Sequence, residues 1–242
     1  MSRPLRVLKV RRLANKPLII EKYDENMCGF AGVIDIKHAL DASRLEDCAR
    51  DMAARIAARG PDDDGVFLDK KAGFAVGFRR LSIVDLSDYG HQPMISQDGR
   101  YVVAFNGEIY NFREIRQTLE EEGFISWRGS SDTEVLLAAI CSYGLDKAIR
   151  LFDGMFAFAL WDIKTSRLHL IRDRLGEKPL YYGWCGSHFL FGSELKAFTA
   201  HVSWQPEIEK RAVTAFLRYS YVPEPFSIYR GILKLRPGHH LQ

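Results

Sequence analysis

The feature that most constrains the fold is a run of short strand-like segments spaced about ten residues apart in the second half of the chain. Gly, Asp, Lys and Ser turns separate these segments, which span residues 155–161, 167–172, 180–183 and 189–192. Strands and helices come in clusters along the chain and not in strict alternation. This arrangement favours an α+β fold with largely antiparallel sheets.

The first half of the chain carries the remaining strands and most of the helices. Apolar patterning predicts strands at residues 28–35, 65–68, 73–78, 81–84 and 101–105. Helical periodicity predicts helices at residues 43–59, 111–122, 133–143 and 207–219, with Asp132 as the N-cap of the third. No linker separates two domains before about residue 205. We therefore expect one domain over residues 28–242, with 206–242 as its closing segment.

The basic character of the chain resides in its first 26 residues. The 242 residues carry a formal net charge of +3, but residues 1–26 hold seven basic and three acidic side chains, so the remainder is slightly acidic. A nucleic-acid-binding arm would interleave such charges with aromatic residues, which this segment does not do. We therefore interpret residues 1–27 as a solvated extension absent from the active form, and we expect no nucleic-acid partner.

Cysteine spacing and hydropathy indicate where the protein works. The four cysteines lie far apart with no metal-ligand spacing, which indicates a reducing, cytoplasmic compartment and no metal site. No apolar run approaches the roughly 20 residues that a membrane-spanning helix needs, so we expect no membrane partner. His239 and His240 are adjacent, but no third ligand accompanies them, and a structural strand is the simpler interpretation.

The tripeptide Met27-Cys28-Gly29 has the form of a protein start, because an initiator methionine is removed when a small residue follows it. Removal would leave Cys28 with a thiol and a free α-amine. That amine titrates near 7.7–8.0 and can act as a general base for the thiol, an N-terminal-nucleophile arrangement. On this tripeptide alone, a structural cysteine at the start of a strand is the more common alternative.

Nine collinear motifs resemble the class II glutamine amidotransferases, above all the glutaminase domain of glutamine-hydrolysing asparagine synthetases. They are CGFAGV, RGPDDDG, RRLSIVDL, QPM, FNGEIYNF, GSSDTEV, GMFAFALWD, RDRLGEKPLYY and GSELKA, all between Cys28 and Ala197. The family often has Arg-His before the RGPD motif, where this chain has Ala57-Ala58. The resemblance implies a four-layer αββα sandwich of two antiparallel sheets, the fold of N-terminal-nucleophile hydrolases.

The resemblance also implies a glutamine site. Catalysis would fall to Cys28, with Asn106 and Gly107 as donors of an oxyanion hole. Without the resemblance, Asn-Gly is equally typical of a hairpin turn, and Asp132 of a helix cap. The residues implied in binding L-glutamine are Arg80 for its carboxylate, Glu108 and Asp132 for its ammonium, and Leu81, Ile83 and Val84 lining the pocket.

The partners implied lie outside this chain. An asparagine synthetase continues into an ATP-using domain with a Ser-Gly-Gly-x-Asp-Ser loop, which does not occur here. We therefore expect no cofactor in this chain, ATP and Mg only in a synthetase domain or subunit, and a homodimer. Two alternatives stay open: a different ammonia acceptor, such as a sugar or secondary metabolite, or a silent regulatory or binding domain if residues 1–27 remain attached.

Overall fold

Two antiparallel sheets form the centre of the molecule. The computed structural model describes residues 27–82, 87–124 and 126–242. The first sheet has the order β10 (Ile232–Lys234), β8 (Tyr181–Cys185), β9 (His188–Gly192), β1 (Gly29–Asp35), β3 (Phe74–Arg80) and β2 (Asp63–Asp69). The second has the order β11 (His240–Leu241), β7 (Arg167–Arg172), β6 (Gly154–Asp162), β5 (Tyr101–Ile109) and β4 (Met94–Ile95). Every pairing within them is antiparallel.

An apolar layer holds the two sheets face to face. Phe30, Phe74 and Phe78 of the first sheet pack against side chains of the second, among them Trp161 and Leu170. The rings of Phe74 and Trp161 stack with centroids 4.2 Å apart. Because alternate residues of a strand point to opposite faces, the other faces of both sheets must bury their apolar side chains against helices.

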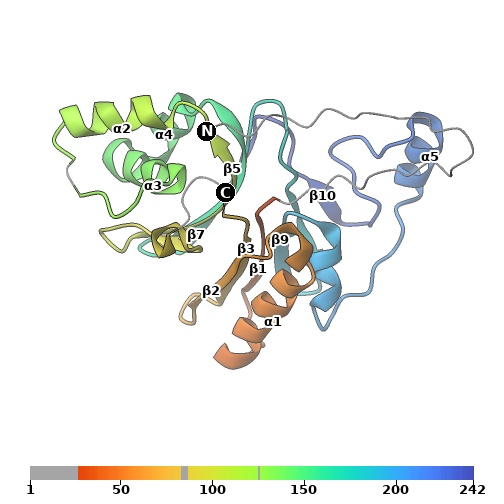
Figure 1. Cartoon of the computed structure of the whole chain (residues 1–242). Coiled ribbons are helices and arrows are strands. Elements are labelled where there is room, and N and C mark those ends of the chain that lie inside the picture. The colour runs from red at the N-terminus through yellow and green to blue at the C-terminus, as the bar shows by residue number, and fades with distance from the viewer. Residues whose placement is uncertain (1–26, 83–86, 125) are drawn as a thin grey trace, which may run out of the picture.

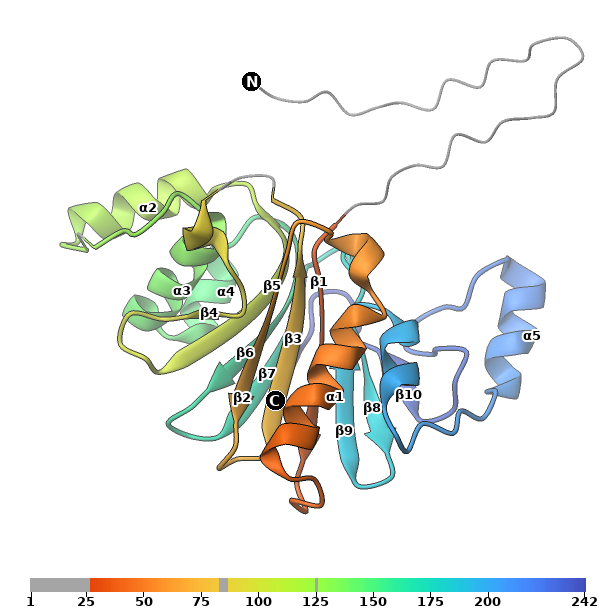
Figure 2. The same ribbon diagram turned by 60° about the horizontal axis from the view of Figure 1, so that its bottom comes forward.

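Helices cover both outer faces, which completes the four layers (Figure 2). Helix α1 (Ala42–Ala54) packs on β1 and β3 of the first sheet. The helices beside the second sheet are α2 (Phe112–Glu121), α3 (Asp132–Tyr143) and α4 (Leu145–Leu151). Short 3₁₀ turns are η1 (Ala57–Arg59), η2 (Asp88–Gly90) and η3 (Leu195–Ala200). The predicted αββα sandwich is confirmed.

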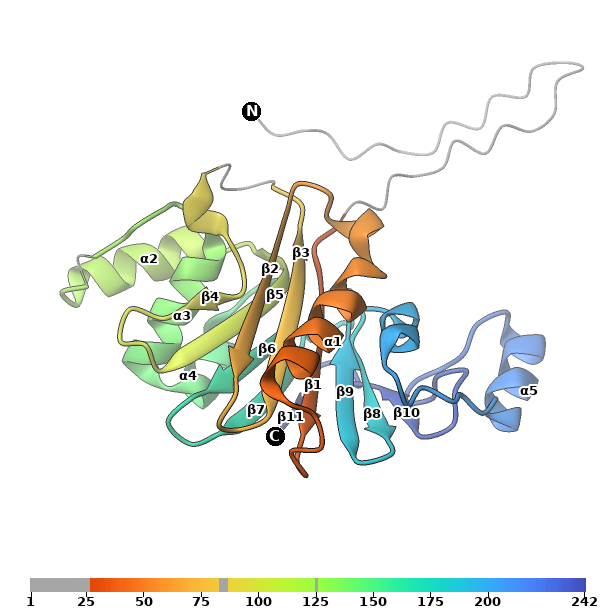
Figure 3. The ribbon, with the colours of Figure 1, turned by 90° about the horizontal axis from the view of Figure 1, so that it is seen from below.

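The closing segment belongs to both sheets. It contributes β10 to the first sheet and β11 to the second, so the end of the chain ties the two layers together. Between η3 and β10, helix α5 (Lys210–Tyr219) lies to one side of the sandwich (Figures 1 and 3). Its Phe216 and Leu217 are exposed.

Several local features differ from what the sequence predicts. Leu81 and Ser82 are not part of a strand, and the rest of the strand predicted at 81–84 lies outside the described residues. Helix α1 ends at Ala54, and the separate turn η1 lies between it and Gly60-Pro61. The segment predicted as one helix is therefore a helix followed by a short turn. Helix α4 was not predicted, since Gly144 marked a stop between two helices that are only one residue apart.

Candidate active site

Cys28 stands immediately before β1, half-buried at the edge of the apolar layer. Its Sγ accepts a hydrogen bond from the backbone N–H of Leu81 at 3.3 Å and lies 3.5 Å from the Leu81 carbonyl oxygen. Burial raises the pKa of the thiol, while the Leu81 N–H and the positive charge of Arg80 act in the opposite direction. The thiol is thus held in place but needs a base to become a nucleophile.

Asn106 and Gly107 lie inside β5, not in a hairpin turn. They pair with Ala157 and Phe156 of β6, and the strand continues to Ile109 before the helix that follows. The pairing with β6 overrides the turn preference of Asn-Gly. A Cβ on Gly107 would lie 2.2 Å from the Met155 carbonyl oxygen, so close strand packing also requires glycine here.

The Asn106 side chain is a buried donor with no internal partner. The residue is 1% exposed, and its Nδ2 makes no hydrogen bond within the described part of the chain. Leaving a buried amide N–H unpaired costs about 1–3 kcal/mol, so a fold that keeps one has a use for it or holds water there. A fixed, unoccupied donor is what an oxyanion needs, because the donor does not have to reorganise when the charge forms.

Arg80 supplies the positive charge of the site from the end of β3. It is 7% exposed, and its Nη1 donates to the Ser87 carbonyl oxygen at 3.1 Å, with Asp63 Oδ2 3.9 Å away. Gly90 leaves room for the guanidinium, since a Cβ there would lie 2.0 Å from Nη2. These contacts hold the planar guanidinium in the fixed orientation that two-point recognition of a carboxylate requires.

Asp132 supplies a buried negative charge as the first residue of α3. Ser131, and not Asp132, is the N-cap, because its side chain accepts from the Glu134 N–H. The Asp132 carboxylate is therefore turned to β5, where Oδ2 accepts from the Ile109 N–H at 3.0 Å. Burial, and to a lesser extent the Glu108 carboxylate, raises the pKa of Asp132 to about 6. Two such neighbouring carboxylates form an acceptor for an ammonium group.

These residues come together around the thiol. Arg80, Asp132 and Arg59 are all close enough to Cys28 to influence the pKa of its thiol. Strand β5, which carries Asn106, Gly107 and Glu108, contacts β1 across the two sheets. Leu81 touches the Cys28 Sγ directly. Ile83 and Val84, the other predicted pocket residues, lie outside the described residues.

Three residues beside Cys28 escaped prediction, although each belongs to a motif of the sequence. Arg59 donates from Nε to the Cys28 carbonyl oxygen at 2.9 Å, and from Nη1 to Glu194 at 2.8 Å. Lys178 reaches Met27 from the loop before β8. The signal was their place in RGPDDDG, GSELKA and RDRLGEKPLYY, but sequence separations of 31 and 151 residues hide the convergence.

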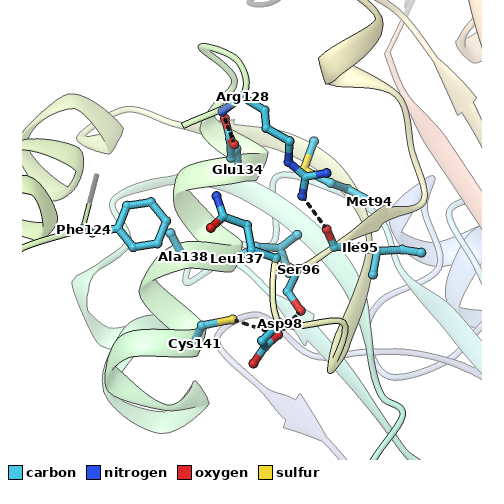
Figure 4. Close-up of a pocket in the computed structure, with 11 residues that line it drawn as sticks. Met94, Ile95, Ser96, Asp98, Phe124, Arg128, Glu134, Leu137, Ala138 and Cys141 are labelled. Atoms are coloured by element: carbon cyan, nitrogen blue, oxygen red, sulfur yellow. Dashed lines mark hydrogen bonds between the residues drawn. The ribbon is translucent and has the colours of Figure 1, made fainter. Parts of the chain in front are cut away.

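A separate cavity lies between α3 and the segment around β4 (Figure 4). Its volume is about 180 Å³, and its lining includes Met94, Phe124, Arg128 and Cys141. None of the residues described around Cys28 lines it. The described residues contain no group of His, Cys, Asp and Glu that could hold a metal ion. They also contain no helix long and apolar enough to cross a membrane.

Comparison with known proteins decides the family. The profile of a glutamine amidotransferase domain matches residues 27–242. The chain belongs to the glutamine amidotransferase family. It is 41% identical over 213 residues to a protein named asparagine synthetase [glutamine-hydrolyzing] 1 of Bacillus subtilis, covering 88% of this chain and 33% of the relative. A putative asparagine synthetase of Methanocaldococcus jannaschii is 34% identical, with 89% of this chain and 44% of the relative covered.

An amidase and a solved amidotransferase are also similar to this chain. An amidase, chry2, of Gibberella zeae is 36% identical over 83% of this chain and 29% of its own length. The solved glutamine phosphoribosylpyrophosphate amidotransferase of Bacillus subtilis superposes with a TM-score of 0.60 at 22% identity, covering 75% of this chain and 45% of that one. The chain therefore has the fold of that amidotransferase and spans less than half the length of these relatives.

Proposed function

We propose that this domain hydrolyses L-glutamine to glutamate and ammonia, with Cys28 as an N-terminal nucleophile. The observation that carries the proposal is the convergence of charges on the half-buried Cys28 thiol, where Arg80 and Asp132 act on the thiol and Glu108 acts on Asp132. Strand β5, which contacts β1, adds Asn106, whose side-chain amide is unpartnered within the described residues. Each group matches one part of glutamine or of its transition state. Arg80, Asn106 and Asp132 are buried, and a role in binding explains why the fold accepts the cost of burying these polar groups.

The substrate would be held by its α-carbon groups. Its carboxylate would bind the Arg80 guanidinium, and its ammonium would lie between Glu108 and Asp132. The raised pKa of Asp132 fits this role, because the arriving ammonium stabilises the ionised carboxylate and supplies binding energy in return. Leu81, Ile83 and Val84 are proposed to line the same pocket, with the carboxamide directed at Cys28.

The reaction would proceed through a thioester on Cys28. The α-amine takes the thiol proton, and Sγ bonds to the carboxamide carbon while the C=O electron pair moves onto oxygen. Asn106 Nδ2 and the Gly107 N–H stabilise that oxyanion. As the oxyanion collapses, the C–N bond breaks and the α-ammonium returns the proton to the leaving nitrogen. The α-amine then deprotonates a water molecule, whose oxygen bonds to the thioester carbon. The C–S bond breaks, glutamate is released, and the Cys28 thiolate takes the proton back from the α-ammonium.

This chemistry requires a free amine on Cys28. In the active form, residues 1–27 would be absent, either because translation starts at Met27 and the methionine is removed, or because the segment is cleaved. Residues 28–242 would then form the domain. If the extension stays attached, position 28 carries an amide that cannot act as a base, and the domain would be a silent binding or regulatory module.

The ammonia would pass to an ATP-dependent synthetase domain or subunit that converts aspartate to asparagine. The names of the relatives support this acceptor. ATP and Mg would bind that partner, with no cofactor in this chain, and the assembly would be a cytoplasmic homodimer. The amidase of Gibberella zeae supports the second candidate, a glutaminase that serves a different acceptor such as a sugar or secondary metabolite.

The test compares three forms of the chain: one starting at Cys28, one starting at Met1, and Cys28→Ala in the shorter form. Mass spectrometry confirms each N-terminus, and glutamate release from glutamine is measured. We expect turnover only from the form with Cys28 first. Turnover by the alanine variant would refute the nucleophile, and equal turnover by the chain that retains residues 1–27 would refute the role of the α-amine.

A further inference from the structure

Lys178 is a buried lysine with no carboxylate partner. It is 6% exposed, and its Nζ makes its one hydrogen bond within the described residues to the Met27 Sδ, at 2.9 Å. No Asp or Glu oxygen of the described chain forms an ion pair with it. A buried ammonium costs free energy unless it is paired, and a thioether is a weak acceptor. The position therefore calls for an explanation beyond packing.

The surrounding loop fixes Lys178 in this place. The Asp173 carboxylate accepts from the Lys178 backbone N–H at 3.0 Å and from the Glu177 N–H at 3.0 Å. The Arg172 Nε donates to the Lys178 carbonyl oxygen at 2.7 Å. Because two buried side chains, Asp173 and Arg172, hold its backbone, the side chain cannot swing out to solvent by a small movement of the loop. The lysine is built into the molecule at the entrance to β8.

Lys178 faces the residue that must leave for Cys28 to work. Met27 is its partner and precedes the nucleophile directly. Once Met27 is gone, the charged head of Lys178 loses its one contact and is left facing the new α-amine. Burial lowers the pKa of Lys178, the nearby Arg59 charge lowers it further, and Cys28 is close enough to act in the opposite direction. The lysine and the nucleophile are therefore electrostatic neighbours.

We propose that Lys178 is a positioning residue of the glutaminase site, whose positive charge repels a proton from the Cys28 α-amine and so keeps that amine available as the base. The inference rests on the proposed function. A lysine ammonium ordinarily titrates near 10.4 and an α-ammonium near 7.7–8.0, so of two adjacent amines the α-amine gives up its proton first. A neighbouring positive charge lowers the pKa of the α-ammonium.

Other charges face the same point. Arg59 of η1 and Arg80 of β3 add positive charge, while Asp132 of α3 adds negative charge. Glu194 neutralises part of Arg59 through their 2.8 Å contact. Asp173 and Glu177, on the loop of Lys178 itself, act on the lysine. Arg59 is thus already paired and Arg80 is assigned to the substrate, so among the described residues Lys178 supplies a positive charge without a carboxylate partner beside the amine.

The first test is the pH profile of kcat/KM for glutamine in chains that begin at Cys28. We expect Lys178→Met to move the acid limb upward by about one unit, so that activity near that limb falls about tenfold while the alkaline plateau stays near wild type. Lys178→Arg keeps the charge and should restore the wild-type profile. Lys164→Met, an exposed lysine on the turn after β6, is the matched control. Lys178→Gln replaces the methionine variant if that one does not fold.

A second measurement separates this inference from the proposed function. In the inactive Cys28→Ala background, the pH dependence of acetylation of the residue-28 amine reports its pKa without any turnover. Adding Lys178→Met should raise that pKa by about one unit. An unchanged pKa of the amine would overturn the role of Lys178. So would an equal loss of kcat/KM in Lys178→Met and Lys178→Arg at every pH. If the wild-type chain beginning at Cys28 released no glutamate, but Lys178→Met still raised the pKa of the residue-28 amine by about one unit, the glutaminase proposal alone would be overturned.

Discussion

The two ends of β1 both bury polar side chains, about 23 Å apart along the strand. At one end Cys28 lies among Arg59, Arg80 and Asp132. At the other end Asp35 is fully buried, pairs in register with His188 of β9, and lies near the buried His201 after η3. Both ends therefore carry the cost of desolvating polar groups in a small sandwich.

Unsatisfied atoms alone do not distinguish the two ends. Within the described part of the chain, Asn106 Nδ2 and Arg59 Nη2 lack hydrogen bonds near Cys28, and Asp35 Oδ1, His201 Nε2 and both ring nitrogens of His188 lack them at the far end. The difference lies in the composition. The Cys28 end combines a thiol, an amide donor and charges of both signs, while the far end is a pair of mutually tilted imidazoles, with centroids 4.7 Å apart, beside one carboxylate.

The largest effect at the Cys28 end of β1 is expected from Asn106→Ala, in the chain that begins at Cys28. Loss of one oxyanion donor should lower kcat about 10²–10³-fold with a much smaller change in KM. Because Nδ2 has no partner within the described residues, its removal breaks no internal hydrogen bond, so the melting temperature should change little. Steady-state kinetics and thermal unfolding check both results.

The matched control is Asn111→Ala. Asn111 donates to the Leu151 carbonyl oxygen at 2.9 Å and accepts from the Asp153 N–H at 3.0 Å. Its truncation should lower stability and leave glutamine turnover intact, the reverse of Asn106→Ala. If Asn106→Ala instead lost stability and kept its activity, Asn106 would be a structural residue.

Asp132→Asn should raise the KM for glutamine and stabilise the fold. The pKa of Asp132 is about 6 in the folded chain against 3.8 for a free carboxyl, so ionising it costs folding free energy above pH 6. Removing the charge should raise the free energy of unfolding by about 3 kcal/mol at pH 7. This gain in stability should vanish as the pH falls below 4. Denaturant unfolding at several pH values measures it.

Glutamine binding provides the second readout for Asp132. The wild-type protein should also lose glutamine affinity as the pH falls below about 6, because the protonated carboxyl no longer attracts an ammonium. Asp51→Asn, at an exposed position of α1, is the control for binding. If the Asp132→Asn variant bound glutamine as tightly as wild type, Asp132 would not belong to the substrate site.

The sequence predicted what is local or periodic, and missed what depends on pairing across the fold. The strand after Cys28 and the helix at 133–143 follow from apolar patterning, and the motifs predicted Cys28, Asn106 and Asp132 as site residues. The strand through Asn106-Gly107 was not predictable from its own residues, because β6 supplies the pairing partner 49 residues away in register (Gly107 with Phe156).

The same limit explains the missed charges. Glu194 is 135 residues from Arg59 and Lys178 is 151 from Met27, so only the folded sheets bring them to Cys28. No sequence pattern predicts the polar cluster at the far end of β1, because Asp35, His188 and His201 are single residues with no common spacing. Their meeting is a consequence of β1–β9 register and of the η3 turn.

The smallest effect is expected at that far end, from His201→Asn. Burial, with a smaller contribution from His188, lowers the pKa of His201 to about 4 against 6.5 for a free histidine. The unfolded chain therefore binds a proton that the folded chain does not, and His201 should cost about 2 kcal/mol of stability between pH 7 and pH 5. Asp132 changes stability in the opposite direction, because its raised pKa makes the fold more stable as the pH falls.

The test of this prediction keeps the hydrogen bond that His201 accepts. The amide introduced by His201→Asn can still accept from the Ser203 N–H, so the variant should flatten the acid slope of the unfolding free energy while glutamine turnover stays at the wild-type level. Parallel pH curves for wild type and variant, or a loss of turnover, would show that the two ends of β1 are not the independent sites that their chemistry indicates.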